Sequence, residues 1–322
     1  MTLPTKVWKC TYACFLLLFT GLAYSETDVP PLLQVQNGHF ITTADGLPSN
    51  YVDDVTIGPQ GFLWVSTAKE LVRYDGKKFT SANDINSIEK PSSARLLGTK
   101  DRLWAADKER LWILSSDRSW ASFALPNHNQ RTVQLNHISS AKNNRLLLAT
   151  TENLIIFDAQ THSFKEQPLR YSGQPITDIR FIHFHNDWFW LSTVAGGIYV
   201  WDGSSENVFS ITKSNPITDK LDATNLYALT SFNDNLWLAT DNGIKVLNDE
   251  LRKMPTPKAI EKLNEVIVDI KVHDKQLFIA TEKAIYTLNS GALEQLTTGG
   301  ITGKLTFNVN GDLYIATASN GL

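Results

Sequence analysis

The segment Leu63-Trp64-Val65-Ser66-Thr67 indicates the fold, because six related segments follow it along the chain. Each has an apolar residue, a second position that is aromatic in six of the seven, another apolar residue and a small residue. The fifth residue is Thr in all but one of them. The second positions lie 40, 43, 43, 47, 41 and 36 residues apart. They are Trp64, Trp104, Leu147, Trp190, Trp237, Phe278 and Tyr314.

Each repeat of about 42 residues has room for four short strands. In the first repeat, turn residues stand at Pro59-Gln60-Gly61 and at Asp75-Gly76, where Asp-Gly favours a tight hairpin. Repeated four-stranded units are typical of a β-propeller, in which each sheet buries its faces against its neighbours. We therefore expect an all-β, seven-bladed β-propeller of four-stranded blades, with the second-strand residues packed between blades. The strands expected in the first repeat are residues 51–57, 62–67, 71–74 and 77–81.

Closure of the ring is expected to involve the N-terminal segment. The seventh repeat reaches Asn320-Gly321-Leu322 just after its second strand, whereas Gln36–Thr42 has the length of one strand. We expect this N-terminal strand to supply the outer strand of the last blade. An alternative is that the chain is the first ring of a double propeller.

The first 25 residues have the pattern of a secretory signal peptide. Lys6 and Lys9 precede an apolar run over residues 12–23, and Ala23-Tyr24-Ser25 forms a small-x-small cleavage site. Residues 26–42 then form an N-terminal segment, and residues 43–322 form the propeller. The net charge of −3 and the absence of a basic block exclude nucleic acid as an expected partner.

The first repeat resembles the two-component regulator propeller family. The residues that carry the resemblance are Thr43-Ala-Asp-Gly-Leu-Pro-Ser-Asn50, Gly61-Phe-Leu-Trp-Val-Ser-Thr67 and Leu71-Val-Arg-Tyr-Asp-Gly76. Glu70 stands where the family has Gly, and the later repeats match more weakly, as at Asp107. The resemblance implies an extracytoplasmic sensor of a bacterial signalling protein, of the two-component or diguanylate cyclase type, located in the periplasm.

The same resemblance sets the expected partners. It implies a small-molecule or glycan ligand or a periplasmic protein, a homodimer formed through a C-terminal part outside these residues, and a membrane link only through a downstream helix. No catalysis and no cofactor are expected. The enzyme alternative is a streptogramin-lyase-like propeller, because the segment Gly311–Thr317 is similar to strands of those enzymes. Such an enzyme would need Mg²⁺ and a histidine proton carrier.

The sequence has no catalytic motif, and its binding candidates are polar residues near the starts of the expected inner strands. His183 and His185 share a strand face but lack a third metal ligand nearby. Adjacent Asp53 and Asp54 are expected on opposite faces of their strand. Concave sites combine a few polar groups with apolar walls, so we expect the ligand near loops at one rim. The candidates are Asn50, Arg95, Arg131, Asp178, Asn225 and Lys304.

Overall fold

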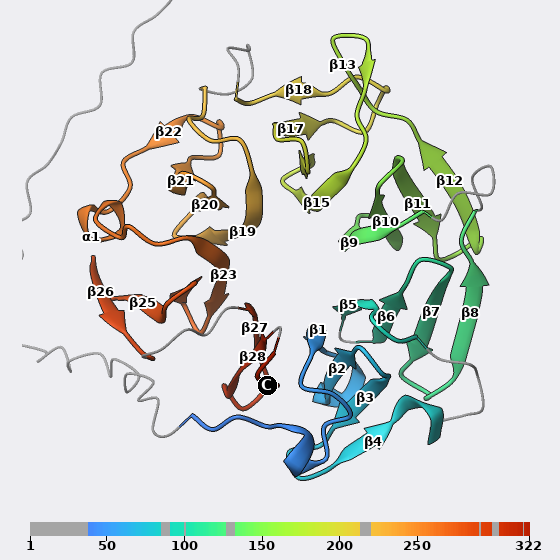
Figure 1. Cartoon of the computed structure of the whole chain (residues 1–322). Helices are drawn as coiled ribbons and strands as arrows, with labels where there is room; N and C mark the ends of the chain where they lie inside the picture. The colour runs from blue at the N-terminus through green and yellow to red at the C-terminus, as the bar shows by residue number, and fades with distance from the viewer. Residues whose placement is uncertain are drawn as a thin grey trace, which may run out of the picture. The chain divides into compact units, whose positions relative to one another are not determined.

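The repeats form antiparallel sheets that follow one another around a ring (Figure 1). The computed structural model describes residues 38–84, 91–99, 101–126, 133–212, 220–289, 291–297, 303–317 and 319–322, all within the unit Val35–Leu322. In these residues, six sheets have four strands, which we number as blades 1 to 6. A further two-stranded sheet, here called sheet 7, comes from the last repeat.

The strands of each blade pair in the order of the sequence. Blade 1 contains β1 (Val52–Ile57), β2 (Leu63–Thr67), β3 (Leu71–Tyr74) and β4 (Phe79–Ser81). Blade 2 contains β5 (Arg95–Gly98), β6 (Arg102–Ala106), β7 (Arg110–Ser115) and β8 (Trp120–Ala124). Blade 3 contains β9 (Leu135–Ala141), β10 (Arg145–Thr150), β11 (Leu154–Asp158) and β12 (Ser163–Gln167).

The second half of the ring repeats this arrangement. Blade 4 contains β15 (Ile179–His185), β16 (Trp188–Thr193), β17 (Ile198–Trp201) and β18 (Phe209–Ser210). Blade 5 contains β19 (Leu226–Phe232), β20 (Asn235–Thr240), β21 (Gly243–Leu247) and β22 (Lys253–Met254). Blade 6 contains β23 (Ile267–His273), β24 (Gln276–Thr281), β25 (Ile285–Asn289) and β26 (Ala292–Gln295), and sheet 7 contains β27 (Gly303–Phe307) and β28 (Leu313–Thr317).

Smaller elements lie outside the blade strands, among them the 3₁₀ turns η1 (Thr43–Asp45), η2 (Pro59–Gly61) and η3 (Ala82–Asp84). A short hairpin, β13 (Arg170–Tyr171) and β14 (Gln174–Pro175), precedes blade 4, and a single helical turn, α1 (Lys258–Glu261), precedes blade 6. Within the described part of the chain, no helix is long and apolar enough to cross a membrane.

The propeller fold is confirmed, but the predicted number of complete blades is wrong. The described residues form six four-stranded blades rather than seven. In the described residues of the last repeat there are two strands, β27 and β28.

The ring closes between sheet 7 and blade 1. The first strands of successive blades contact one another, and β27 and β28 both contact β1. Ile41 exchanges two backbone hydrogen bonds with Leu322, at N–O distances of 2.9 and 3.0 Å, and the Gly321 amide donates to the Asn50 carbonyl oxygen. Gln36 lies outside the described residues, and residues 38–42 form no strand. Within the described residues 38–42, the backbone pairing with the last repeat is made by Ile41.

The second-strand residues lie between blades. Trp64 packs with Leu103 of blade 2, and Trp190 packs with Leu236 of blade 5. Both indoles are almost fully buried, and burial of apolar area on both faces of each sheet is the main force holding the blades together. In the same way, each of the other second-strand residues joins the apolar cluster shared with the next sheet. These residues are Trp104, Leu147, Trp237, Phe278 and Tyr314.

Candidate functional site at the ring centre

The first strand of each repeat places one residue at an equivalent position beside the ring centre. In the sheet registers this residue lies opposite the small residue of the repeat, as Asp54 lies opposite Ser66 and His137 opposite Ala149. We call these seven residues the inner ring. In chain order they are Asp54, Arg95, His137, Phe181, Ala228, Asp269 and Lys304.

The inner ring has a polar part and an apolar part. The polar residues come from five consecutive sheets, which are blade 6, sheet 7 and blades 1, 2 and 3. Around this arc, acidic and basic residues alternate before the arc ends at a histidine. Phe181 and Ala228 complete the ring with apolar side chains. The order of the arc is Asp269, Lys304, Asp54, Arg95 and His137.

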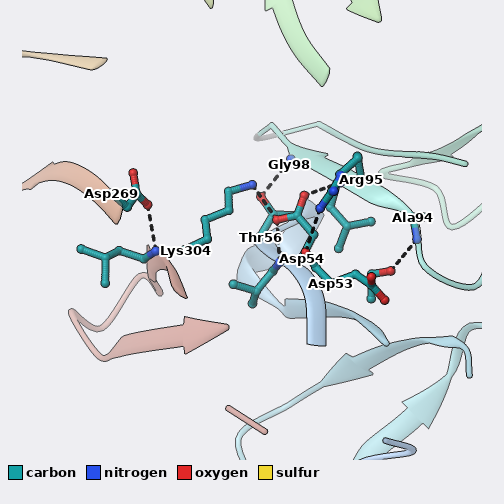
Figure 2. Close-up of polar contacts among 12 residues, drawn as sticks. Asp53, Asp54, Thr56, Ala94, Arg95, Gly98, Asp269 and Lys304 are labelled. Atoms are coloured by element: carbon teal, nitrogen blue, oxygen red, sulfur yellow. Dashed lines mark hydrogen bonds and ion pairs between the residues drawn. The ribbon is translucent and has the colours of Figure 1, made fainter. Parts of the chain in front are cut away.

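Asp54 ties three sheets together (Figure 2). Its buried carboxylate accepts hydrogen bonds from the Val55 amide and from the Leu96 amide of blade 2, both at 2.8 Å. The ammonium group of Lys304, from sheet 7, lies 2.7 Å from Asp54 Oδ1. A buried carboxylate is stable only when such donors replace water. Asp54 therefore connects both neighbours of β1 at the ring closure.

Asp269, from blade 6, accepts an equivalent pair of backbone amide hydrogen bonds, one of them from sheet 7. Its carboxylate accepts from the Ile270 amide at 2.8 Å and from the Leu305 amide of sheet 7 at 2.9 Å. Burial raises the pKa of Asp269, although the positive charges of Lys271 and Lys304 and the two amides act against that rise. The carboxylates of Asp54 and Asp269 each accept a hydrogen bond from a backbone amide on the exposed edge of the first strand of the next sheet.

A β-bulge lies at the start of β1, at Asp53. The register shifts between Val52 and Asp54, so Asp53 is left without a partner on β2. Its carbonyl oxygen accepts from Arg95 Nη1 at 3.2 Å. Burial raises the pKa of the Asp53 carboxyl, and the neighbouring Asp54 adds to the rise.

His137 is a neutral group surrounded by cations. Burial, followed by the charges of Lys304, His183, Arg95 and Lys271, holds its pKa well below the ordinary value. Its buried Nδ1 has no hydrogen-bond partner among the described residues. A cluster of donors with an unsatisfied imidazole is suited to binding carboxylate or hydroxyl groups of a ligand.

The two histidines of β15 (Ile179–His185) lie in different surroundings. His185 lies 3.3 Å from the Ser231 hydroxyl through Nδ1, whereas His183 lies deeper, opposite Trp190. No group of three or more His, Cys, Asp or Glu residues that could hold a metal occurs in the residues that the structure describes.

The pH dependence of stability should report on His183. Burial, with smaller contributions from Lys271 and His185, lowers its pKa to about 4. Since the unfolded imidazole has a pKa near 6.5, the unfolded chain binds the proton first as pH falls. We therefore expect His183 to cost about 3 kcal/mol of stability between pH 6.5 and pH 4. Urea unfolding across this range checks the expectation.

A matched pair of variants isolates this effect. His183→Gln should reduce the pH dependence of the unfolding free energy, because it removes one of the two buried imidazoles whose pKa is lowered, while His137 keeps its contribution. The same change at the exposed His39 should leave that dependence as in the wild type. A parallel loss of stability in wild type and His183→Gln would contradict the assignment.

Only two of the residues predicted for the site lie in the inner ring, namely Arg95 and Lys304. The Asn50 side-chain oxygen accepts from the Thr43 amide at 2.8 Å. Asp178 has a positive φ of 49°, and its amide donates to the Thr151 carbonyl.

Asn225 Nδ2 donates to Asp241 at 3.2 Å, and Arg131 lies outside the described residues. Three polar residues of the inner ring are missing from the sequence-based candidates. A count of strand positions that included the β-bulges would have found them, because each lies opposite the small residue of its repeat. They are Asp54, His137 and Asp269.

Comparisons with known proteins agree on the fold. No family model and no curated protein matches the sequence. A solved structure described as the extracellular domain of the hybrid two-component system BT3049 from B. thetaiotaomicron superposes with a TM-score of 0.66 at 18% identity, over 88% of this chain. The chain resembles these extracellular domains in its fold. The extracellular domain described for the one-component system BT4673 of the same organism gives a TM-score of 0.64 at 15% identity, again over 88% of this chain.

The solved structures differ in how much of their own length this chain covers. The chain covers 41% of the BT3049 domain and 39% of the BT4673 domain, so it spans about two fifths of their length. A structure of YCF48 bound to D1 peptide is covered over 91% of its own length, with a TM-score of 0.61 and 11% identity. At these identities the likeness concerns the fold.

Proposed function

We propose that the chain is an extracytoplasmic ligand-sensing propeller of a bacterial signalling protein, with its ligand at the polar part of the inner ring. The observation that carries the proposal is the buried, unsatisfied Nδ1 of His137, which shares the equivalent first-strand position with Arg95 and Lys304. The likeness to extracellular domains of signalling systems supports the sensor role and favours it over the lyase alternative.

The chemistry of the site favours a ligand with an acidic group or several hydroxyl groups. Lys271 has no hydrogen-bond or ion-pair partner among the described residues, and Arg95 donates one hydrogen bond to a neutral carbonyl. Both cations can therefore pair with an acidic ligand without losing a carboxylate partner. A small molecule, a glycan or an acidic segment of a periplasmic protein would satisfy this requirement.

Binding at the inner ring would act on the ring closure. Lys304 holds Asp54 across the boundary between sheet 7 and blade 1, and a ligand acid would compete for the same ammonium group. The N-terminal contact Ile41–Leu322 lies at this boundary as well. We propose that the resulting shift passes to a membrane helix and an output domain outside these residues, within a homodimer in the periplasm.

Thermal unfolding in the presence of a panel of sugar acids, oligosaccharides, amino acids and short peptides tests the proposal. At least one compound should raise the melting temperature of the wild type and have no effect on Arg95→Ala. Lys108→Ala, at an exposed turn, is the matched control and should respond like the wild type. Stabilisation that is equal in Arg95→Ala, or absent for the whole panel, would refute a binding site at the inner ring.

A further inference from the structure

A cleft of about 490 Å³ opens between blades 3 and 4, away from the inner ring. Its apolar walls are formed by Leu147 and Ile156 from blade 3 and by Phe184, Phe189 and Trp201 from blade 4. The aromatic wall is continuous, since the ring centroids of Phe184 and Phe189 lie 4.8 Å apart and those of Phe189 and Trp201 also lie 4.8 Å apart.

The cleft coincides with the one repeat that lacks an aromatic second-strand residue. Leu147 occupies the position held by Trp, Phe or Tyr in the other six repeats. Each of these residues fills the contact with the next sheet, so a smaller side chain leaves volume there. The sequence replacement therefore accounts for the place of the cleft.

The contact between blades 1 and 2 provides an internal comparison. A cavity at the equivalent place measures only about 10 Å³, and Trp64 lines it. The positions correspond by register, because Trp64 lies opposite Arg73 as Leu147 lies opposite Ile156. The Trp64 ring also meets Trp120 edge to face, at 5.9 Å between centroids. An indole thus fills in blade 1 the space that stays open beside Leu147.

At the rim of the cleft, Lys165 is a cation without an acidic partner among the described residues. Lys142 pairs with Asp187, and Arg145 Nε lies 4.0 Å from Asp158 Oδ2. Lys165 lies opposite Ile156 on β12, is exposed, and forms no ion pair with any residue that the structure describes. A bound acid could pair with Lys165 without breaking either existing ion pair.

We propose that this cleft binds a small aromatic carboxylate. Its ring would occupy the volume that tryptophan fills in blade 1, against Phe184 and Phe189, and its carboxylate would pair with Lys165. Ring contacts of this kind give affinity through buried apolar area and aromatic packing, and the lysine selects the acid. This site is separate from the inner ring and does not rest on the proposed sensor function.

Calorimetric titration of the full chain with indole-3-acetate, and with indole as the neutral comparison, tests the proposal. Indole-3-acetate should bind the wild type at least tenfold more tightly than indole. Lys165→Met should remove this difference, whereas Lys108→Met should preserve it. Binding of both compounds with equal affinity to the wild type would overturn the role of Lys165.

Leu147→Trp tests the position of the site. Restoring the aromatic residue of the repeat should weaken binding of indole-3-acetate at least tenfold, because the new indole occupies the cleft. Leu147→Phe introduces the residue that blade 6 has at the equivalent position, Phe278, and should also weaken binding of indole-3-acetate. It replaces Leu147→Trp in the test if the tryptophan variant does not fold. Unchanged affinity in a folded variant of either kind would overturn the proposal.

Discussion

Gly98→Val is expected to lower the free energy of unfolding by about 4 kcal/mol or more. A Cβ atom at Gly98 would lie 1.7 Å from the Ile57 carbonyl oxygen and 2.8 Å from Thr56 Oγ1. Both contacts belong to β1, so the side chain would push blades 1 and 2 apart where their inner strands meet. The Gly98 amide would also lose its hydrogen bond to Thr56 Oγ1, which measures 3.0 Å.

Urea unfolding, followed by tryptophan fluorescence, measures this effect. Gly38→Ala is the matched control, because a Cβ atom there meets nothing within 4 Å, and its stability should equal that of the wild type. The conclusion would be wrong if Gly98→Val unfolded at the same urea concentration as Gly38→Ala. Such a result would mean that the inner strands of blades 1 and 2 do not approach as closely as described.

Asp54→Ala is expected to cost about 3–5 kcal/mol, because three donors lose their acceptor at once. Two of them are the amides of Val55 and Leu96, and the third is the Lys304 ammonium. Lys304→Met should cost only about 1 kcal/mol, since the carboxylate keeps both amide donors and the partly exposed lysine contributes less.

A double-mutant cycle with these two changes separates the ion pair from the amide contacts. The double variant should be less destabilised than the sum of the single variants, because the lysine no longer lacks a partner once it is removed. Chemical denaturation of all four proteins at pH 7 gives the coupling. A loss below about 1 kcal/mol in Asp54→Ala would show that water replaces the carboxylate, and the closure would not depend on it.

The sequence by itself determined the local pattern of the chain. Strand alternation, Asp-Gly turns and the repeated second-strand residues predict four-stranded units in series, since these signals depend only on neighbours in the sequence. They also marked Leu147 as the exceptional residue of its series. For the same reason, the propeller fold could be predicted before any contact between blades was known.

Only the tertiary structure decided how the repeats combine. The Leu96 amide that Asp54 reaches on blade 2 and the open cleft at Leu147 depend on contacts between residues about 42 positions apart. The incomplete sheet 7 likewise replaced an expected blade. Side-chain periodicity specifies which face of a strand is buried, but it carries no information on which atoms meet across two packed sheets. Both sites proposed for this protein depend on such contacts between neighbouring sheets.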